Sequence, residues 1–362
     1  MTSTTEPVAD RDRGTPAERP LHPWRRRVAW AAGSVLVLTA LLVATVLIVI
    51  NVTPRPGALV IRALFDRGAD SVTAQLEQGA PTTVDRIADQ QYRPGDSDAL
   101  LDVYVPQAAV ADNAALPTVV WTHGGAWVSG SKDHYAGYYQ RLADRGFTVV
   151  SLGYSLGPEH TYPTPVHQLN DAHAYLLANA ERLHVDPNRI ALAGDSAGAQ
   201  LSSQLAALVT SPDYARELGV TPALSPAQLR AVVLNCGIYE VPAMTGTGGL
   251  VGWGADTSMW AYTGEKDVQN SVPVRQMSTL RHVTAAYPPT YVSGGNGDPL
   301  TETQSKPLAG KLTGLGVRTD TLFFPTDLEP ALPHEYQFDL GREESRLAFE
   351  RTVDFLEAHT AP

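Results

Sequence analysis

The stretch IALAGDSAGAQLSSQLAALV, which runs from Ile190 to Val209, decides the fold. Its first four residues are an apolar run typical of a buried strand, and apolar residues at helical spacing begin at Leu201. Between these two parts lies a G-x-S-x-G pattern, with glycines at 194 and 198 around Ser196. A strand, a sharp turn and a helix are the context in which this pattern presents an exposed serine. The stretch therefore predicts that Ser196 stands on a tight turn between a strand and a helix.

Short apolar runs alternate with amphipathic segments on both sides of this turn. Buried strands are predicted at 118–122, 148–152, 190–193, 231–235, 290–293 and 319–324. Helices are predicted at 135–145, 166–183, 199–209, 305–315 and 345–357. Two further strands, 84–92 and 100–105, are separated by turn residues and predict a leading hairpin. The alternation predicts an α/β fold with a mostly parallel sheet, helices on both faces, and the hairpin as its antiparallel edge.

Composition excludes several classes of protein. The chain has 362 residues, and its 43% hydrophobic share with 18% charged residues excludes a disordered or fibrous protein. Its single cysteine, Cys236, excludes an internal disulfide and any zinc site built on two thiolates, and we expect it to pack in a strand. The net charge of -11 argues against binding of nucleic acid, which needs clustered basic residues.

The N-terminal region contains a hydrophobic segment without charges. Residues 28–50 include 13 Val, Leu or Ile residues, and as a helix they are long enough to cross a hydrocarbon core of about 30 Å. A secretory signal peptide has a shorter apolar region and ends at a small-x-small cleavage site, which residues 48–54 do not provide. The segment therefore predicts a retained signal anchor, with a cleaved leader and secretion as the alternative.

The arginines before this segment predict its orientation. Arg25, Arg26 and Arg27 adjoin its start, and three more arginines precede them. Positive charge is enriched on the cytoplasmic side of membrane spans. We therefore expect a single-pass membrane protein with a cytoplasmic N-terminus and everything from Asn51 onward outside. Residues 1–20 have the composition of a disordered tail.

A serine hydroxyl needs a base, and the base needs a carboxylate that orients it. In strand-turn-helix hydrolases of this kind the chain order is serine, acid, histidine. Two histidines follow the late strands, and His359 is too close to a frayed helix end, which leaves His334 as the predicted base. The acid is Asp298, because a glycine-rich turn after strand 290–293 delivers it to the carboxyl end of the sheet. Asp320, Asp327 and Glu302 are less well placed.

The negative charge that develops on a substrate carbonyl oxygen needs hydrogen-bond donors already in place. The sequence HGGAW, from His123 to Trp127, follows the predicted strand 118–122, and glycine there permits close approach of the backbone. We predict an oxyanion hole made of backbone N–H groups of this loop together with that of Ala197. His123 is expected to brace the loop by hydrogen bonding and not to act as a base.

These motifs together resemble the hormone-sensitive-lipase-like branch of the α/β hydrolases. The resemblance rests on HGGAW and GDSAG, on Tyr154 to Glu159, on GDPL ending at Leu300 and on the histidine of PHEYQF, and it covers residues 84–357. It implies an α/β-hydrolase fold with cap elements from the N-terminal segment and an insert, and a serine esterase that uses no cofactor and no metal. It assigns Ser196 as nucleophile, His334 as base and Asp298 as its partner. It also assigns the oxyanion donors as Gly124, Gly125 and Ala197. Ala126 and Ala199 stand where many relatives have glycine.

The predicted function is hydrolysis of small or medium acyl esters through an acyl-enzyme. A deacetylase or an amidase that uses the same triad stays open, because HGG followed by one residue and Trp is also similar to polysaccharide-side-chain esterases and aryl formamidases. A non-catalytic membrane-anchored scaffold of this fold is the other alternative. The predicted partners are a small-molecule ester and, through the N-terminal helix, a membrane.

The predicted organisation has four parts. Residues 1–27 are a basic cytoplasmic tail, 28–50 the membrane anchor, 51–82 a linker with a short cap helix or two, and 83–362 the catalytic domain. Within that domain residues 237–286 are rich in glycine and are predicted to form one long irregular insert.

Overall fold

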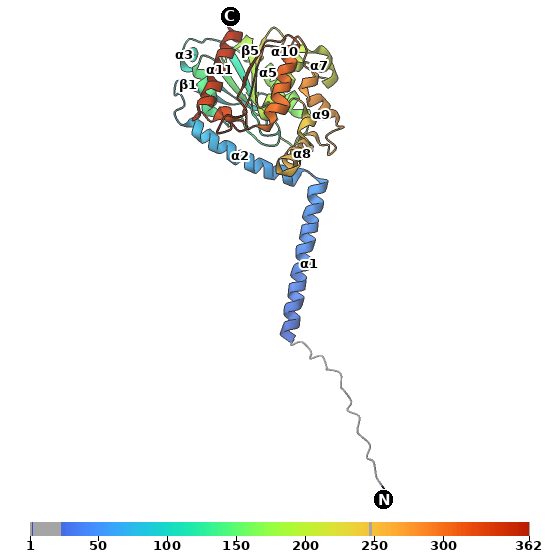
Figure 1. Ribbon diagram of the computed structural model, residues 1–362. Coiled ribbons are helices and arrows are strands. Elements are labelled where there is room, and N and C mark those ends of the chain that lie inside the picture. The colour runs from blue at the N-terminus through green and yellow to red at the C-terminus, as the bar shows by residue number, and fades with distance from the viewer. Residues whose placement is uncertain (1, 3–22, 246–247, 362) are drawn as a thin grey trace. The chain divides into compact units, whose positions relative to one another are not determined.

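The computed structural model describes residue 2 and residues 23–245 and 248–361 (Figure 1). Most of the predicted cytoplasmic tail, including all of 3–20, therefore lies outside the described residues, as does Gly246 of the predicted insert. Contacts divide the chain into two units, residues 1–52 and residues 53–362. Each is described by itself.

The first unit contains one long apolar helix, α1 (Pro23–Val52). Its most apolar stretch has a mean hydropathy of 2.9, and no part of that stretch is buried. Within the described ranges it is the one helix that is long and apolar enough to cross a membrane. A signal sequence meets the same description. Its thirty residues correspond to about 45 Å of helix, more than the thickness of a hydrocarbon core.

The second unit is built around an eight-stranded sheet. The strands are β1 (Val84–Gln91), β2 (Leu100–Pro106), β3 (Leu116–Thr122), β4 (Thr148–Leu152), β5 (Val185–Asp195), β6 (Leu229–Asn235), β7 (Thr290–Gly294) and β8 (Thr319–Phe323). Their spatial order is β1-β2-β4-β3-β5-β6-β7-β8. The pairs β1–β2 and β2–β4 are antiparallel, and the other pairs are parallel. The predicted leading hairpin and parallel sheet are confirmed.

Helices cover both faces of the sheet, as predicted. One face packs against α5 (Thr164–Ala178), α6 (Ser196–Thr210) and α10 (Lys306–Gly314), and the other against α4 (Ala136–Asp144) and α11 (Glu343–Thr360). Alternate residues of β3 serve the two faces, since Val120 packs in the first core and Val119 and Trp121 in the second. Shorter helices are α3 (Gln107–Ala111), α7 (Pro212–Leu218), α9 (Val272–Met277) and the single turns η1 (Val241–Met244), η2 (Thr279–Arg281), η3 (Thr301–Ser305) and η4 (Tyr336–Phe338).

Two cap helices form, one where the sequence predicts a short helix or two and the other where it predicts an irregular insert. Residues 58–76 belong to one long helix, α2 (Arg55–Glu77), which follows α1 after two residues. The expectation of one long irregular insert at 237–286 is wrong, because it contains α8 (Gly249–Thr263), and α2 and α8 pack together. The buried side chains of α8, among them Met259 and Tyr262, gain more from packing than its glycines, at about 1 kcal/mol each, cost the helix.

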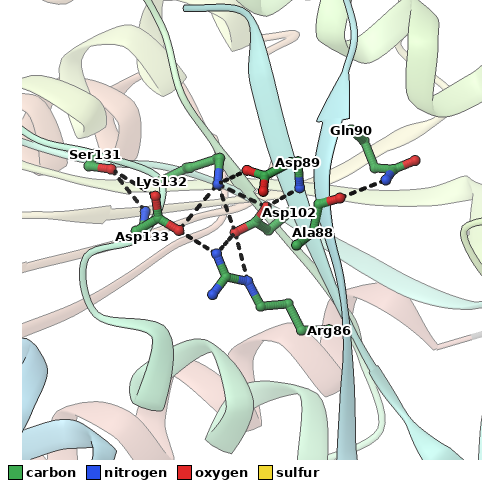
Figure 2. A network of polar contacts seen from close by, with 8 residues as sticks. All are labelled: Arg86, Ala88, Asp89, Gln90, Asp102, Ser131, Lys132 and Asp133. Carbon is green, nitrogen blue, oxygen red and sulfur yellow. Dashed lines mark hydrogen bonds and ion pairs between the residues drawn. The ribbon is translucent and has the colours of Figure 1, made fainter.

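A buried ionic network joins the leading hairpin to the segment that follows HGGAW (Figure 2). Asp102 on β2 is fully buried and accepts hydrogen bonds from Arg86 Nε at 2.9 Å, from the N–H of Asp89 at 2.7 Å and from Lys132 Nζ at 3.2 Å. Arg86 and Lys132 also bond to Asp133. Because two cations neutralise the buried carboxylate, the network fixes the position of residues 131–133 against the sheet.

Candidate active site

Ser196 stands on the predicted turn between β5 and α6. Its φ of 51° lies in the left-handed region, which is strained for a residue with a side chain. The flanking glycines are needed for space. A Cβ on Gly194 would lie 2.6 Å from the Gly198 carbonyl carbon, and a Cβ on Gly198 would lie 2.0 Å from the Thr122 carbonyl oxygen. The local backbone therefore forces a glycine-serine-glycine pattern and presents the serine at the carboxyl end of the sheet.

The structure brings Ser196, His334 and Asp298 together. Asp298 lies on the turn after β7 and His334 on the loop after β8, and His334 Nδ1 is 2.8 Å from Asp298 Oδ2. With the Nδ1–H donating to this buried carboxylate, Nε2 is free to accept the Ser196 hydroxyl, whose Oγ is 2.9 Å away. The N–H of Leu300 donates to the other Asp298 oxygen at 2.9 Å. The arrangement is suited to removing the serine proton.

Charges around His334 shift its pKa upward. Burial lowers the pKa, but the hydrogen bond and the charge of Asp298, followed by the charges of Glu335 and Asp195, outweigh burial and raise it to about 9. Glu335 Oε1 lies 3.8 Å from His334 Nε2. An imidazole acts as a base only in its neutral form, so this environment favours catalysis at alkaline pH.

The HGGAW loop follows β3 and has an unusual backbone. Three consecutive residues, Gly125, Ala126 and Trp127, have φ of 104°, 51° and 60°. Successive left-handed residues turn backbone N–H groups toward one side of a loop. The N–H of Gly125 donates in none of the hydrogen bonds found between described residues, and the N–H of Ala197, in the first turn of α6, has no acceptor within the helix.

Gly124 differs from the other two predicted donors. Its N–H donates to Asp195 Oδ2 at 2.8 Å. A Cβ at Gly124 would lie 2.4 Å from Asp195 Oδ2, 2.8 Å from Glu335 Oε1 and 3.0 Å from Ser196 Cβ. Glycine is therefore required at this position to let two carboxyl groups and the serine converge.

Side chains outside the sheet hold the HGGAW loop in place. Trp127 is fully buried, stacks on Tyr262 of α8 with ring centroids 5.4 Å apart, and donates from Nε1 to Gln200 at 3.0 Å. From α2, Arg62 Nε donates to the Val128 carbonyl at 2.5 Å, and Asp66 accepts from Ser129 Oγ at 2.6 Å. The two cap helices thus fix the loop from outside.

His123, the first residue of HGGAW, is a neutral brace. Burial lowers its pKa to about 4. Its Nδ1 is 2.8 Å from the Gly124 carbonyl oxygen, to which a neutral imidazole donates, and its ring stacks on Tyr154 with centroids 4.4 Å apart. The hydrogen bond by which His123 was expected to brace the loop is therefore made to the neighbouring residue of the same loop.

A second pair of carboxyl groups, Asp195 and Glu335, was not predicted from the sequence. Asp195 is fully buried and accepts hydrogen bonds from Trp121 Nε1 at 2.7 Å and from the Gly124 N–H. Burial, followed by the negative charge of Glu335 and a hydrogen bond to it, raises the pKa of Asp195 well above its usual range. These surroundings therefore favour the protonated, uncharged form of Asp195. The signals were present as the Asp of GDSAG and the Glu after the predicted base, but sequence alone did not place them together.

One group among the described residues has ligand atoms close enough to hold a metal ion. These atoms, from Cys236, Asp298 and His334, lie within 4.8 Å of one another. Burial raises the pKa of the Cys236 thiol well above its usual range, so it is not the thiolate that binds metals. A metal would also compete with the Asp298–His334 hydrogen bond. The arrangement fits the triad better than a metal site.

The sheet order, its antiparallel edge and the serine turn at the end of β5 define an α/β hydrolase, so the predicted fold is confirmed. The chain belongs to the BD-FAE family, whose model matches residues 101–312. Its resemblance to α/β-hydrolase esterases is likewise confirmed by the relatives described next.

Several curated relatives are named esterases. Carboxylesterase NlhH of Mycobacterium tuberculosis is 40% identical over 129 residues, which cover 35% of this chain and 38% of NlhH. Esterase LipQ of the same organism is 27% identical over 275 residues, which cover 75% of this chain and 62% of LipQ. The chain thus spans between about two fifths and three fifths of the length of these two relatives.

Solved esterases share the fold. Esterase B of Lactobacillus rhamnosis has a TM-score of 0.70 at 24% identity, and the match covers 84% of this chain and 96% of that structure. A hyperthermophilic esterase of the archaeon Pyrobaculum calidifontis has a TM-score of 0.65 at 25% identity, with 83% and 93% covered. The match reaches almost the whole of each solved chain.

Proposed function

We propose that this protein is a serine hydrolase of carboxylic esters with small or medium acyl groups. The observation that carries the proposal is the hydrogen-bonded chain Ser196–His334–Asp298, with distances of 2.9 and 2.8 Å, at the carboxyl end of the sheet. The names of the relatives, which are esterases, support the same class of substrate.

The proposed reaction begins with neutral His334. Its Nε2 takes the proton from Ser196 as Oγ attacks the acyl carbon, and Asp298 stabilises the imidazolium that forms. The imidazolium then gives this proton to the leaving alcohol oxygen, which leaves an acyl-serine. Water attacks the acyl carbon while His334 accepts one water proton, and the return of that proton to Ser196 releases the carboxylic acid.

The developing oxyanion is proposed to bind the N–H groups of Gly125 and Ala197. Gly124 was predicted as a third donor, but its N–H is engaged with Asp195 Oδ2. We therefore assign Gly124 a spacing role, since any side chain there would meet Asp195, Glu335 and Ser196. Loss of one donor in such a hole typically costs about 100-fold to 1,000-fold in turnover.

We further propose that α1 is a retained membrane anchor with the catalytic unit outside the cytoplasm. Its length, its apolar composition and the three arginines at 25–27 support this orientation. Protease protection of the catalytic unit in sealed spheroplasts or vesicles tests it, and a domain digested only from the cytoplasmic side would reverse the assignment.

A fluorophosphonate probe, which labels activated serines, tests the catalytic proposal. The intact chain is expected to be labelled, and Ser196→Ala is expected to lose labelling while keeping its unfolding temperature. The hydroxyl-bearing Ser202, buried in the next turn of the same helix, provides a matched control as Ser202→Ala. Equal labelling of the Ser196→Ala variant would overturn the proposal. Comparison of an aryl ester, an acetylated sugar and an aryl formamide then distinguishes an esterase from a deacetylase or amidase.

A further inference from the structure

The cap helices expose most of the large apolar side chains on the catalytic unit. Outside α1, the described residues expose ten such side chains, and seven of them lie on α2 and α8. We call these seven the cap patch: Leu59, Val60, Leu64, Phe65, Leu250, Val251 and Trp253. Leu250 and Val251 are 87% and 77% exposed. Exposed apolar side chains gathered on two packed helices mark an interaction surface.

The two halves of the cap patch belong to helices in close contact. A Cβ added to Gly57 of α2 would lie 3.1 Å from the Trp253 ring and 2.7 Å from Thr257 Cγ2 of α8. Ala58 and Ile61 of α2 pack with Ala261 of α8 in one small core. Figure 1 shows α8 beside the end of α2 at which the chain arrives from α1.

The exposed face of α2 changes character along its length. Leu59, Val60 and Leu64 are exposed in its first three turns, whereas the later exposed positions include Arg67, Asp70 and Gln75. Arg62 and Asp66, in the same turns of α2, are only partly exposed and bond to Val128 and Ser129 after HGGAW. The apolar surface is therefore confined to the end of α2 that adjoins α1.

The short chain connection between α1 and α2 limits how far this end of α2 can lie from the end of α1. α1 ends at Val52 and α2 begins at Arg55, so three residue steps, about 11 Å at full extension, separate the two helices. The polar region of a bilayer beyond the hydrocarbon is about 5–8 Å thick on each side. If α1 spans a bilayer, the first turns of α2 are thus held at its surface.

We propose that the cap patch docks on the surface of the lipid bilayer that α1 crosses, with its aliphatic side chains and Trp253 in the interfacial layer. Exposed aliphatic side chains and tryptophan are the groups that enter this layer. The second unit is acidic overall, so attraction to anionic lipids does not supply the binding. The short connection between α1 and α2 favours docking instead, because it makes docking intramolecular, so weak apolar contacts are sufficient. The inference rests on the proposed anchor, and its first test below requires no enzymatic activity.

Fluorescence of probes on single introduced cysteines tests docking. The full chain is reconstituted at one copy per phosphatidylcholine nanodisc, with an environment-sensitive dye at Leu64→Cys, Leu250→Cys or, as control, Val110→Cys. Val110 is also an exposed apolar residue, on α3 at the far end of the unit in Figure 1. The native Cys236 is fully buried and does not compete for the dye.

Nitroxide-labelled lipid is expected to quench most of the emission of dyes at 64 and 250 and to leave the dye at 110 unchanged. Equal quenching at all three positions, or none at 64 and 250, would overturn the proposal. A further measurement uses vesicles that hold several copies and no nitroxide lipid. If the emission of the dyes at 64 and 250 changes only in these vesicles, a second copy of the chain is the occupant, and the proposal is overturned.

A double variant, Leu64→Asp with Leu250→Asp, supplies the functional readout. Turnover of a water-soluble acetyl ester is expected to stay unchanged, whereas turnover of an ester dissolved in the bilayer is expected to fall about tenfold, because a carboxylate is expelled from the interfacial layer. Equal loss on both substrates would point to a damaged active site and reject docking as the cause. Failure of the proposed esterase function would remove turnover of both substrates in the parent chain, yet leave the quenching result standing.

Discussion

Asp102 and Asp195 are both fully buried, and their surroundings show how one residue type serves two purposes in this molecule. Asp102, on the outer part of the sheet, is surrounded by two cations, Arg86 and Lys132 (Figure 2). Asp195, at the end of β5, has N–H donors and a second carboxyl group, Glu335, as neighbours.

The difference lies in how each site offsets the cost of burying a carboxylate. Cations around Asp102 neutralise its charge and make a rigid structural joint. At Asp195 no described cation takes that role, and burial beside Glu335 instead raises the pKa of its carboxyl group well above the usual range. The negative charges of Glu335 and Asp195 in turn raise the pKa of His334. Buried charge stabilises the structure in the first region and tunes a reacting group in the second.

The largest effect is expected from a third buried aspartate, Asp298, whose partner is His334, the proposed base. Asp298→Asn keeps the shape but loses the charge that orients His334, and an equivalent change in a serine protease triad lowers kcat about 10,000-fold. We expect a similar loss in ester hydrolysis with little change in unfolding temperature. Steady-state kinetics and thermal unfolding measure the two quantities. A loss below tenfold would show that Asp298 does not orient the base.

Asp102→Asn is expected to reverse this pattern. The change leaves Lys132 and Arg86 without their buried carboxylate, and breaking a buried ion pair costs about 3–5 kcal/mol of unfolding free energy. The kcat of the folded fraction should stay within a few-fold of the parent. Denaturant unfolding of the catalytic unit, followed by near-UV circular dichroism, measures the loss. The control is Asp112→Asn, which changes an exposed aspartate directly after α3 and should leave the stability unchanged. Equal stability of the two variants would contradict the structural role of Asp102.

Much of this architecture was predictable because it depends on local patterns. The apolar run at 148–152 has the bounds of β4, and the glycines around Ser196 predict a turn that only glycine can make. Asp298 and His334 follow successive parallel strands, whose carboxyl ends lie along one edge of the sheet. Such topology brings distant residues together, so chain order was enough to select them.

Features that depend on contacts between distant segments were not predictable. The helix α8 forms in a glycine-rich stretch because Tyr262 stacks on Trp127, more than a hundred residues away. The position of Glu335 depends on its own left-handed φ of 58°, and together with Gly124 this places its carboxyl group beside Asp195. No periodicity in the sequence encodes either contact.

The carboxyl groups around His334 in the second region predict a distinctive pH dependence. Neutral His334 is the proposed active form and its pKa is raised to about 9, so kcat/KM should rise with pH, about tenfold per unit, and level off near pH 9. Removing the charge nearest to Nε2 with Glu335→Gln should lower the midpoint by about one unit. Asp195→Asn should move it less, because Glu335 keeps its charge. Rates with a water-soluble ester between pH 6 and 10 measure the midpoints.

Glu343→Gln, which removes an exposed carboxylate at the start of α11, is the control and should leave the midpoint unchanged. A midpoint near 6.5 in the parent chain would contradict the inferred electrostatics of the site. An unchanged midpoint in the Glu335→Gln variant would instead assign the raised pKa to Asp298 alone.

The smallest effect is expected where α2 meets the HGGAW loop. It tests whether α2 only stabilises the structure, as Asp102 does, or also affects the reacting groups, as Asp195 does. Arg62 and Arg55 both lie on α2 and both bond to Glu159, but only Arg62 also donates to the carbonyl groups of Val128 and Gly157. Arg62→Met should therefore loosen the loop and lower kcat about tenfold, a loss equivalent to about 1.4 kcal/mol and within the usual range for charge-assisted hydrogen bonds. Arg55→Met, which removes an exposed ion pair, should leave kcat unchanged. If both variants lose stability without losing kcat, α2 only supports the fold. If only Arg62→Met loses kcat, α2 helps to position the proposed oxyanion donors.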